Sequence, residues 1–206
     1  MNKDYIINNL NKLLPDAHCE LNYHKDYELL IEVMLSAQST DKRVNEVAEN
    51  LFSKYDLFDL NNMDVKEIEK IIKPVGTYHK KAVFIKKIAE SLINNYDGKV
   101  PNNREYLESL PGVGHKTTNV VLANLYGISA FAVDTHVMRV SKRLGIADEN
   151  DSVLKIEEKI NKFFPKENWN KLNDQFILFG RYYCKAQNPK CEECPFKDFC
   201  KYKKVI

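Results

Sequence analysis

A lysine that follows a glycine-rich turn is the residue best suited to covalent chemistry in this chain. Residues 105–110 are expected to form a short helix that Pro111 ends, and a new helix is expected to begin near His115. Lys116 therefore lies at the start of a helix, where the helix dipole disfavours a protonated ammonium group. A neutral lysine amine is a nucleophile that forms Schiff bases. Lys116 is thus a candidate catalytic nucleophile.

Asp134 is the carboxylate that could assist such a lysine. It directly precedes an expected helix that contains Arg139 and Arg143, a position at which Asp commonly caps the helix N-terminus. A Schiff-base lysine also needs a nearby carboxylate that handles protons and stabilises positive charge. A structural cap and a catalytic carboxylate are both consistent with the sequence at this point.

The turn itself could bind phosphate. Gly112 and Gly114 allow the backbone to approach a ligand closely, and the N–H groups at the start of the next helix point outward. The spacing differs from that of a Walker A loop, which needs four residues between its glycines and a Gly-Lys pair. A plain connection between two helices explains the same glycines, so both interpretations remain open.

Four cysteines near the end of the chain have the spacing of a metal site. The pattern is Cys184-x6-Cys191-x2-Cys194-x5-Cys200. The first ten residues lack the apolar stretch of a signal peptide, so a cytosolic location is expected, and there such a group favours a metal over disulfides. Zinc and an iron–sulfur cluster each accept four thiolates, and the presence of only one Cys-x2-Cys pair favours the cluster without excluding zinc. The isolated Cys19 is expected to be a small buried hydrophobe.

Lysines surround the cysteine pattern. A loop that a metal holds rigid could present them to phosphates. They are Lys185, Lys190, Lys197, Lys201, Lys203 and Lys204.

Helices must position these groups. Apolar residues recur at three- and four-residue spacing over 27–35, 65–72, 83–92, 137–144 and 176–180, and no alternating strand pattern is evident. We therefore expect an all-α protein with roughly ten short helices. Left-handed caps are expected at Gly127 and Gly145, and helix starts at Thr40 and Asp151.

Composition and charge narrow the class of protein. The 206 residues include 31 Lys and Arg, 29 Asp and Glu, and 44% hydrophobic residues, which is the balance of a globular protein rather than a disordered one. No apolar run approaches the ~20 residues that span a bilayer, so no membrane association is expected and the expected location is the cytoplasm. Acidic residues are in excess over 1–65, whereas 66–90 and 185–206 are basic. The basic segments could form one face for a polyanion, or they are simply solvated surfaces.

Five segments together resemble one known family. They are LSAQSTD at 35–41, VGTYHKKA at 75–82, LPGVGHK at 110–116, VDTHV at 133–137, and the cysteine pattern. In this order and spacing they resemble endonuclease III, a family of iron–sulfur DNA glycosylases in the helix-hairpin-helix superfamily. The resemblance covers nearly the whole chain.

The resemblance implies a fold and a reaction. The expected fold has a helix-hairpin-helix domain at 21–130, a discontinuous cluster domain at 1–20 and 131–206, and a DNA-binding cleft between them. Lys116 matches the nucleophile that attacks C1′ of a damaged nucleotide, expels the base and nicks the strand by β-elimination, and Asp134 matches the catalytic carboxylate. The four cysteines match the ligands of a [4Fe-4S] cluster. The implied partner is double-stranded DNA that contains oxidised pyrimidines or abasic sites, bound by a monomer that is associated with the nucleoid if the source is bacterial.

The resemblance also implies DNA contacts, because a glycosylase must first flip its nucleotide out of the helix. Gln38 matches the residue that fills the resulting gap. Thr77 stands where the family has a bulky apolar wedge, and His79 is expected to share that role. His115 stands where the family often has Arg or Lys. Without the resemblance, Gln38 would be interpreted as a solvated loop residue, and His136 and Arg139 as residues that cover the surface of their helix. The complete set of expected DNA contacts is Gln38, Thr77, His79, Gly112, Gly114, His115, His136 and Arg139.

Three other kinds of protein share some of these features. Adenine-mismatch glycosylases share the hairpin and the cluster but normally lack the lysine and carry an extra C-terminal domain. Thymine-mismatch glycosylases of similar length usually replace the lysine as well. A non-catalytic DNA-binding module would need neither Lys116 nor Asp134. The presence of both residues favours the bifunctional glycosylase and lyase.

Overall fold

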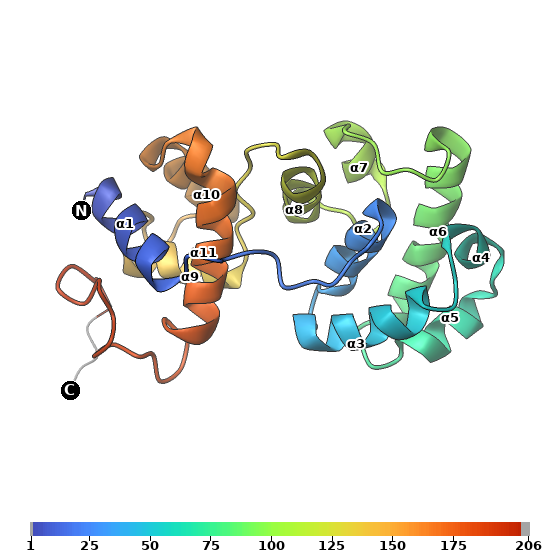
Figure 1. The fold of residues 1–206 in the computed structure, drawn as a ribbon, viewed down its shortest axis with the longest axis horizontal. Helices are drawn as coiled ribbons and strands as arrows, with labels where there is room; N and C mark the ends of the chain where they lie inside the picture. Colours follow the sequence, from blue (N-terminus) through green and yellow to red (C-terminus); the bar gives the residue numbers. More distant parts are fainter. Residues whose placement is uncertain (1, 203–206) are drawn as a thin grey trace. The chain divides into compact units, whose positions relative to one another are not determined.

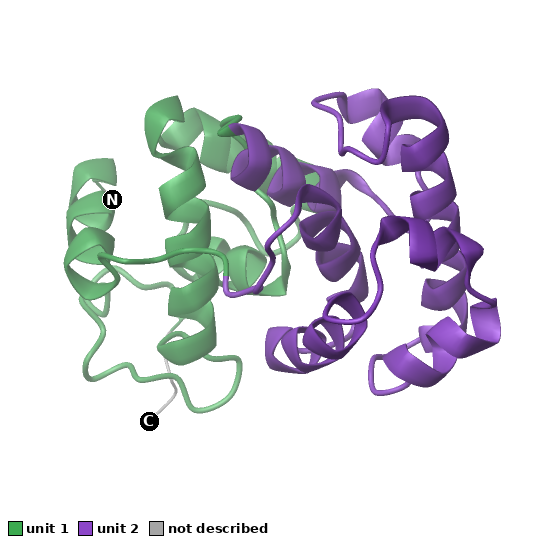
Figure 2. Cartoon of the chain, turned by 45° about the vertical axis from the view of Figure 1, so that its right-hand side comes forward, with its two compact units in different colours: residues 1–19, 127–206 green, residues 20–126 purple. Residues whose placement is uncertain are grey.

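The computed structural model describes residues 2–202 and is entirely helical over that range. It contains eleven α-helices and one 3-10 helix, and no strand occurs among the described residues, so the all-α prediction is confirmed (Figure 1). The chain divides into two compact units, residues 20–126 and residues 1–19 with 127–206 (Figure 2). The domain roles expected for 21–130 and for 1–20 with 131–206, and a cleft between them, stay predictions. Lys203 and Lys204 lie outside the described residues.

Residues 20–126 form a unit built around α2. This helix is buried along nearly its whole length, including Glu28 and Glu32. It packs against α3, α6 and α8, while α6 also packs against α4 and α5. The helices of the unit are α2 (Asp26–Leu35), α3 (Asp41–Phe52), α4 (Leu57–Asn62), α5 (Val65–Ile72), α6 (Tyr78–Tyr96), α7 (Arg104–Ser109) and α8 (His115–Tyr126).

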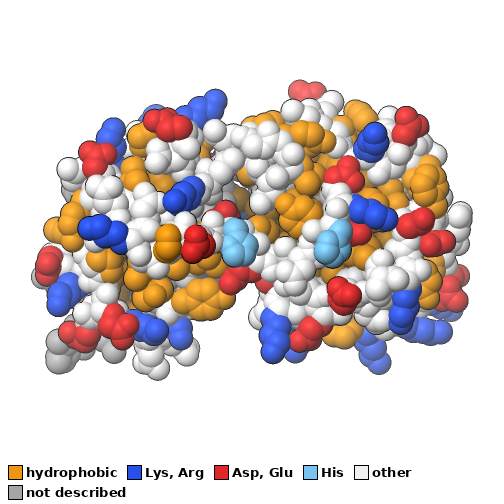
Figure 3. Space-filling model, in the orientation of Figure 1, with side chains coloured by type: hydrophobic (Ala, Val, Ile, Leu, Met, Phe, Trp, Pro, Cys, Tyr) orange, Lys and Arg blue, Asp and Glu red, His pale blue; other side chains and the backbone are white. Residues whose placement is uncertain are grey.

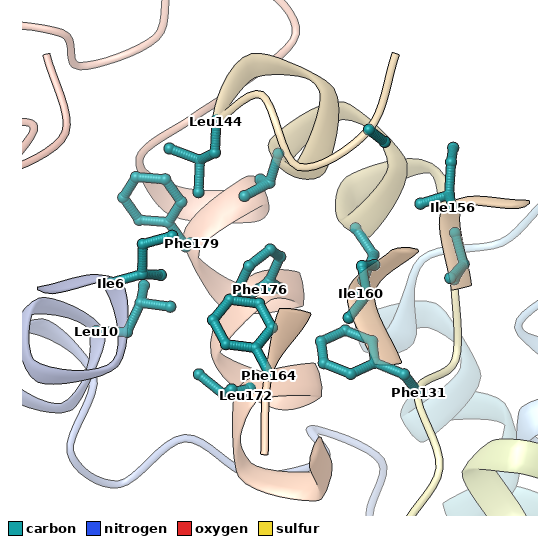
Figure 4. Close-up of a cluster of buried hydrophobic side chains, with 14 of the residues drawn as sticks. Ile6, Leu10, Phe131, Leu144, Ile156, Ile160, Phe164, Leu172, Phe176 and Phe179 are labelled. Atoms are coloured by element: carbon teal, nitrogen blue, oxygen red, sulfur yellow. The ribbon is translucent and has the colours of Figure 1, made fainter. Parts of the chain in front are cut away.

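The other unit joins the N-terminal helix to the C-terminal part of the chain. Its elements are α1 (Lys3–Leu13), α9 (Thr135–Arg143), α10 (Val153–Phe163), the 3-10 helix Lys166–Asn168 and α11 (Trp169–Tyr182). Its core is aromatic: Phe131 and Phe164 each meet the ring of Phe176 edge to face (Figure 4). Ile6 and Leu10 of α1 are fully buried in the same core. Burial of these large side chains stabilises the unit across a long sequence separation.

The helix ends agree with the sequence in three of four predicted positions. Thr40 caps α3 by accepting a hydrogen bond from the Arg43 N–H, and Gly127 and Gly145 have positive φ after α8 and α9. The prediction for Asp151 is wrong, because Ser152 is the N-cap of α10. The Asp151 carboxylate instead accepts hydrogen bonds from the Asp148 N–H in the preceding turn and from Lys159 Nζ of α10.

The surface of each unit mixes charge types. On the face drawn in Figure 3, basic, acidic and apolar side chains are interspersed over both units. Within residues 2–202, no helix is long and apolar enough to cross a membrane.

Candidate active site and metal centre

The turn between α7 and α8 has the predicted geometry, and its two glycines differ. Val113 N donates to Leu110 O at 3.1 Å, and Gly112 has φ 79°. A Cβ on Gly112 would lie 2.5 Å from Phe84 Cδ2, so the fold itself needs glycine there. A Cβ on exposed Gly114 would meet nothing within 4 Å. Packing therefore explains Gly112, whereas Gly114 leaves open space for a ligand from outside the chain.

Lys116 is the second residue of α8 and is half-buried. Thr117 and Thr118 behind it are buried, and α8 packs along α2. The first turn of an α-helix has backbone N–H groups without intrahelical acceptors, which create a partial positive charge. Lys116 thus lies at the positive end of the α8 dipole, the position expected from the sequence.

A polar network supports the hairpin, and the sequence did not point to all of it. Arg104 of α7 donates to Asn119 Oδ1 of α8 at 2.8 Å and pairs with Glu108 at 3.0 Å. His115 Nδ1 lies 3.3 Å from Glu108 Oε1. The network links α7 to α8 and anchors the His115 ring near a carboxylate. The i,i+4 spacing of Arg104 and Glu108 is the sequence signal that could have revealed their ion pair.

The loops that carry Gln38 and Thr77 lie against each other in the same unit. Both residues are exposed and have left-handed backbones, with φ 59° and 56°. Gly76 N donates to Ser39 Oγ at 3.0 Å, and a Cβ on Gly76 would lie 2.9 Å from Gln38 O. Positive φ is uncommon outside glycine and an outlier for a β-branched residue. Such strain costs about 1–3 kcal/mol per residue and occurs most often at functional sites.

His79 lies in the first turn of α6, beyond the tip of its loop. Its Nδ1 is 3.0 Å from Glu69 Oε1 of α5, and its ring lies 4.0 Å from that of Tyr78. These contacts hold the His79 side chain beside Glu69 and Tyr78. Thr77, and not His79, therefore occupies the strained tip of the loop before α6. The shared wedge role of His79 stays a prediction.

Asp134 belongs to the other unit and caps α9. Its Oδ1 accepts hydrogen bonds from the His136 and Val137 N–H groups, each at 2.8 Å. The structural interpretation is therefore correct, and it is compatible with a chemical role. The two hydrogen bonds hold a half-buried carboxylate in one orientation at the positive end of a helix.

The surroundings of His136 favour the neutral form of its imidazole. Burial lowers its pKa, and Arg139 and Arg181 lower it further against the opposing effect of Asp134. Arg139 Nη2 lies 3.2 Å from His136 Nδ1. A phosphate contact by His136 stays a prediction.

Arg139 makes its contacts inside its own unit. Its Nε donates to Cys184 O at 2.9 Å and its Nη2 to Gly180 O at 2.8 Å. A Cβ on Gly180 would lie 2.8 Å from His136 Cβ, so α9 and α11 approach closely at this point. The guanidinium thus joins α9 to the end of α11, and the phosphate contact expected for Arg139 has to compete with these carbonyls.

The four cysteines of the predicted pattern line one cavity of about 200 Å³. None of the four forms a disulfide within residues 2–202, and burial raises the pKa of Cys194 and Cys200, with the other cysteines adding to the effect. Four cysteine side chains that line one cavity are the ligand set that a [4Fe-4S] cluster takes.

Arg143 closes one side of this cavity. Its Nη1 lies 3.4 Å from Cys184 Sγ and donates to Lys185 O at 2.8 Å. Its guanidinium stacks 3.8 Å from the centre of the Tyr202 ring. A hydrogen bond to a sulfur ligand is one way in which a protein stabilises a cluster thiolate. The sequence indicated a helix for Arg143 but not this contact.

Two family models match the chain. Residues 31–166 match the HhH-GPD superfamily base excision DNA repair protein model. Residues 184–200, which span all four cysteines, match the iron–sulfur binding domain of endonuclease III.

Known proteins are similar over nearly the full chain. Endonuclease III of Bacillus subtilis (strain 168) is 44% identical over 96% of this chain and 91% of the relative. Endonuclease III of Escherichia coli (strain K12) is 39% identical over 98% and 95%. The solved structure of a trapped endonuclease III–DNA covalent intermediate, an estranged-adenine complex, matches with TM-score 0.93 and 47% identity over 96% and 93%. A thermostable thymine-DNA glycosylase matches with TM-score 0.85 and 27% identity over 97% and 95%.

Proposed function

The chain belongs to the endonuclease III family of base-excision DNA repair proteins, and we propose from this premise which of its residues perform each step. It is a DNA glycosylase with AP lyase activity that acts on oxidised pyrimidines in double-stranded DNA, and it holds a [4Fe-4S] cluster. The observation that carries our assignment is Lys116, half-buried in the first turn of α8 and two residues after the exposed Gly114.

Lys116 is the proposed nucleophile. Its neutral amine attacks C1′ of the flipped nucleotide, the glycosidic bond breaks, and the base leaves with the bonding electrons and takes up a proton. The new secondary amine loses a proton, the C1′–O4′ bond breaks as the nitrogen lone pair forms a C=N bond to C1′, and O4′ takes up a proton. The protonated Schiff base formed in this way makes the C2′ proton acidic. Loss of that proton expels the 3′ phosphate and nicks the strand. Asp134, oriented by its two backbone hydrogen bonds, stabilises positive charge at the sugar and takes part in proton transfer.

The hairpin and the two strained loops are proposed to hold the DNA. The N–H groups around Gly112, Gly114 and His115 bind a backbone phosphate at the positive end of α8. Gln38 fills the space that the flipped nucleotide leaves, and Thr77 inserts beside the unpaired base of the opposite strand. His79, His136 and Arg139 are further proposed contacts.

Cys184, Cys191, Cys194 and Cys200 are the proposed cluster ligands, and Arg143 supports the first of them. When bound, the cluster would hold the loop that contains the four cysteines in one rigid conformation. The neighbouring Lys190 and Lys197 side chains, which line the same cavity, would then be presented to phosphates. We further propose that the protein acts as a monomer in the cytoplasm, at the nucleoid, because its relatives include bacterial enzymes.

A panel of duplexes tests the function. Each duplex carries one oxidised pyrimidine, one abasic site or one G·T mismatch at the same position. We expect base release and nicking at the oxidised pyrimidine and nicking at the abasic site, with little release of thymine. Preferred release of mismatched thymine without nicking would instead support the thymine-mismatch alternative.

Alanine at each hairpin glycine should separate packing from ligand binding. Gly112→Ala is expected to lower the free energy of unfolding by about 1–3 kcal/mol, because its Cβ would collide with Phe84 and its φ is positive. Gly114→Ala should leave the denaturation midpoint unchanged and weaken binding to an abasic duplex. Unaltered affinity of G114A would contradict a phosphate contact at this turn.

Substitution of a proposed ligand should remove the cluster. Cys194→Ser is expected to lose the visible iron–sulfur absorbance and to lower iron and sulfide well below the equimolar content expected of the wild type. Cys19→Ser, which changes a cysteine outside the cavity, serves as the matched control and should retain both. Stoichiometric zinc in protein purified without oxygen would overturn the assignment.

A further inference from the structure

Lys81 is a buried lysine that the proposed reaction does not use. It lies on α6 with 3% of its surface exposed, and burial lowers its pKa. Its Nζ donates to Leu35 O at 2.8 Å and to Ala37 O at 2.6 Å. Placing an ammonium group in the interior costs free energy unless its hydrogen bonds compensate. The position therefore has a specific task that an apolar side chain would not perform.

The two carbonyls belong to the end of α2 and to the loop that follows it. Leu35 is the last residue of α2, and Ala37 directly precedes Gln38. The carboxyl end of a helix carries unsatisfied carbonyls and a partial negative charge, both of which an ammonium satisfies. Lys81 thus caps α2 from a different helix and fixes the backbone on one side of Gln38.

The same lysine is also tied to the second loop. Lys81 N donates to Thr77 O at 3.2 Å, so its backbone belongs to the first turn that begins at Thr77. The Gly76–Ser39 hydrogen bond and the close approach of Gly76 to Gln38 O complete the connection between the loops. One residue therefore contacts both loops, and each loop carries one exposed residue with a strained left-handed backbone.

We propose that Lys81 is a positioning residue that holds Gln38 and Thr77 together in the conformation in which they enter DNA. The clamp formed by Lys81, Gly76 and Ser39 supplies the constraint that two strained residues require. It lets the two side chains insert as one unit without ordering the loops at the moment of binding. This inference rests on the proposed insertion of Gln38 and Thr77.

The test compares substrates that differ in the cost of extruding the nucleotide. One duplex is fully paired around an oxidised pyrimidine. The other has mismatches on both sides of it, which lower the free energy needed to extrude the damaged nucleotide. Lys81→Met keeps the aliphatic stem and removes the ammonium. We expect kcat/KM of K81M to fall about tenfold or more on the paired duplex and less than about threefold on the mismatched one.

Two controls accompany this variant. Lys80→Met changes the exposed neighbouring lysine and should affect both duplexes by the same factor. Gly76→Ala pushes the loops apart without touching the buried ammonium, since its Cβ would lie 2.9 Å from Gln38 O. G76A should show the same larger loss of kcat/KM on the paired duplex than on the mismatched one. If K81M does not fold, G76A alone tests the clamp. A fluorescent adenine analogue opposite the lesion should brighten on binding of wild type and less with G76A.

The outcomes separate this proposal from the proposed function. Wild-type protein that releases no base from either duplex overturns the function itself. Active wild type, with a folded K81M or G76A whose ratio of activities on the two duplexes equals that of wild type, overturns the clamp. In that case Lys81 only caps α2, and K81M would lower the melting temperature alone.

Discussion

Lys116→Ala is expected to abolish covalent trapping on an abasic duplex in the presence of borohydride. Borohydride reduces the Schiff base and leaves the enzyme attached to the DNA, so the yield of adduct reports the nucleophile directly. Alanine has no amine, and the expected loss is several orders of magnitude rather than a few-fold decrease. Because Lys116 lies on the surface side of α8, K116A should fold and bind the duplex normally.

A matched control exists in the same unit. Lys66 is exposed and is likewise the second residue of its helix, α5, so Lys66→Ala removes an equivalent charge. It should trap with nearly the wild-type yield. Adduct formation by K116A at the wild-type level would show that another amine attacks C1′ and would overturn the assignment.

Glu32→Gln is expected to change how stability depends on pH. Glu32 has no exposed surface, and neither carboxyl oxygen has a hydrogen-bond partner among residues 2–202. Burial, with additional repulsion from Glu28 and Asp41, raises its pKa to about 8. Between pH 4.5 and 8 the folded state therefore holds a proton that the unfolded state has released. The free energy of unfolding should fall over this interval, by up to about 5 kcal/mol.

The glutamine variant cannot titrate, so it lacks this component. Relative to wild type, E32Q should become progressively more stable as the pH rises from 5 to 8, and the difference should level off above pH 8. Urea denaturation at several pH values measures it. Glu49→Gln, at an exposed site on α3, is the control, and its free energy of unfolding should depend on pH in the same way as that of wild type. A constant difference between E32Q and wild type across this interval would contradict the buried neutral carboxyl.

The sequence predicted the parts of the site that depend on local order. The hairpin turn follows from Pro111 and the glycines, and the cap at Asp134 follows from its place before a helix. The four cysteines lie within one short segment, so their grouping around one cavity could be predicted from spacing. The three- and four-residue spacing of apolar residues was sufficient to predict the all-α class.

What the sequence did not predict depends on which side of a helix faces the core. Lys80 and Lys81 are adjacent and alike in type, yet one is exposed and the other buried. Spacing from Lys81 to Ile85 and Ile88 follows the buried stripe of α6, which is the signal that could have distinguished them. Glu32 lies within the apolar run of α2, where nothing local reveals that its carboxyl lacks a partner.

The pairing of α1 with the last helices has a consequence for biosynthesis. Gln175 Nε2 donates to Asn11 Oδ1 and Leu14 O, across almost the whole chain. Residues 20–126 can fold on the ribosome soon after they emerge, whereas Ile6 and Leu10 must wait for α11 to bury them. The cysteines are translated later still. The cluster can therefore be loaded only after the last helix has been made, and a chain terminated before α11 would leave Ile6 and Leu10 of α1 without the partners that bury them.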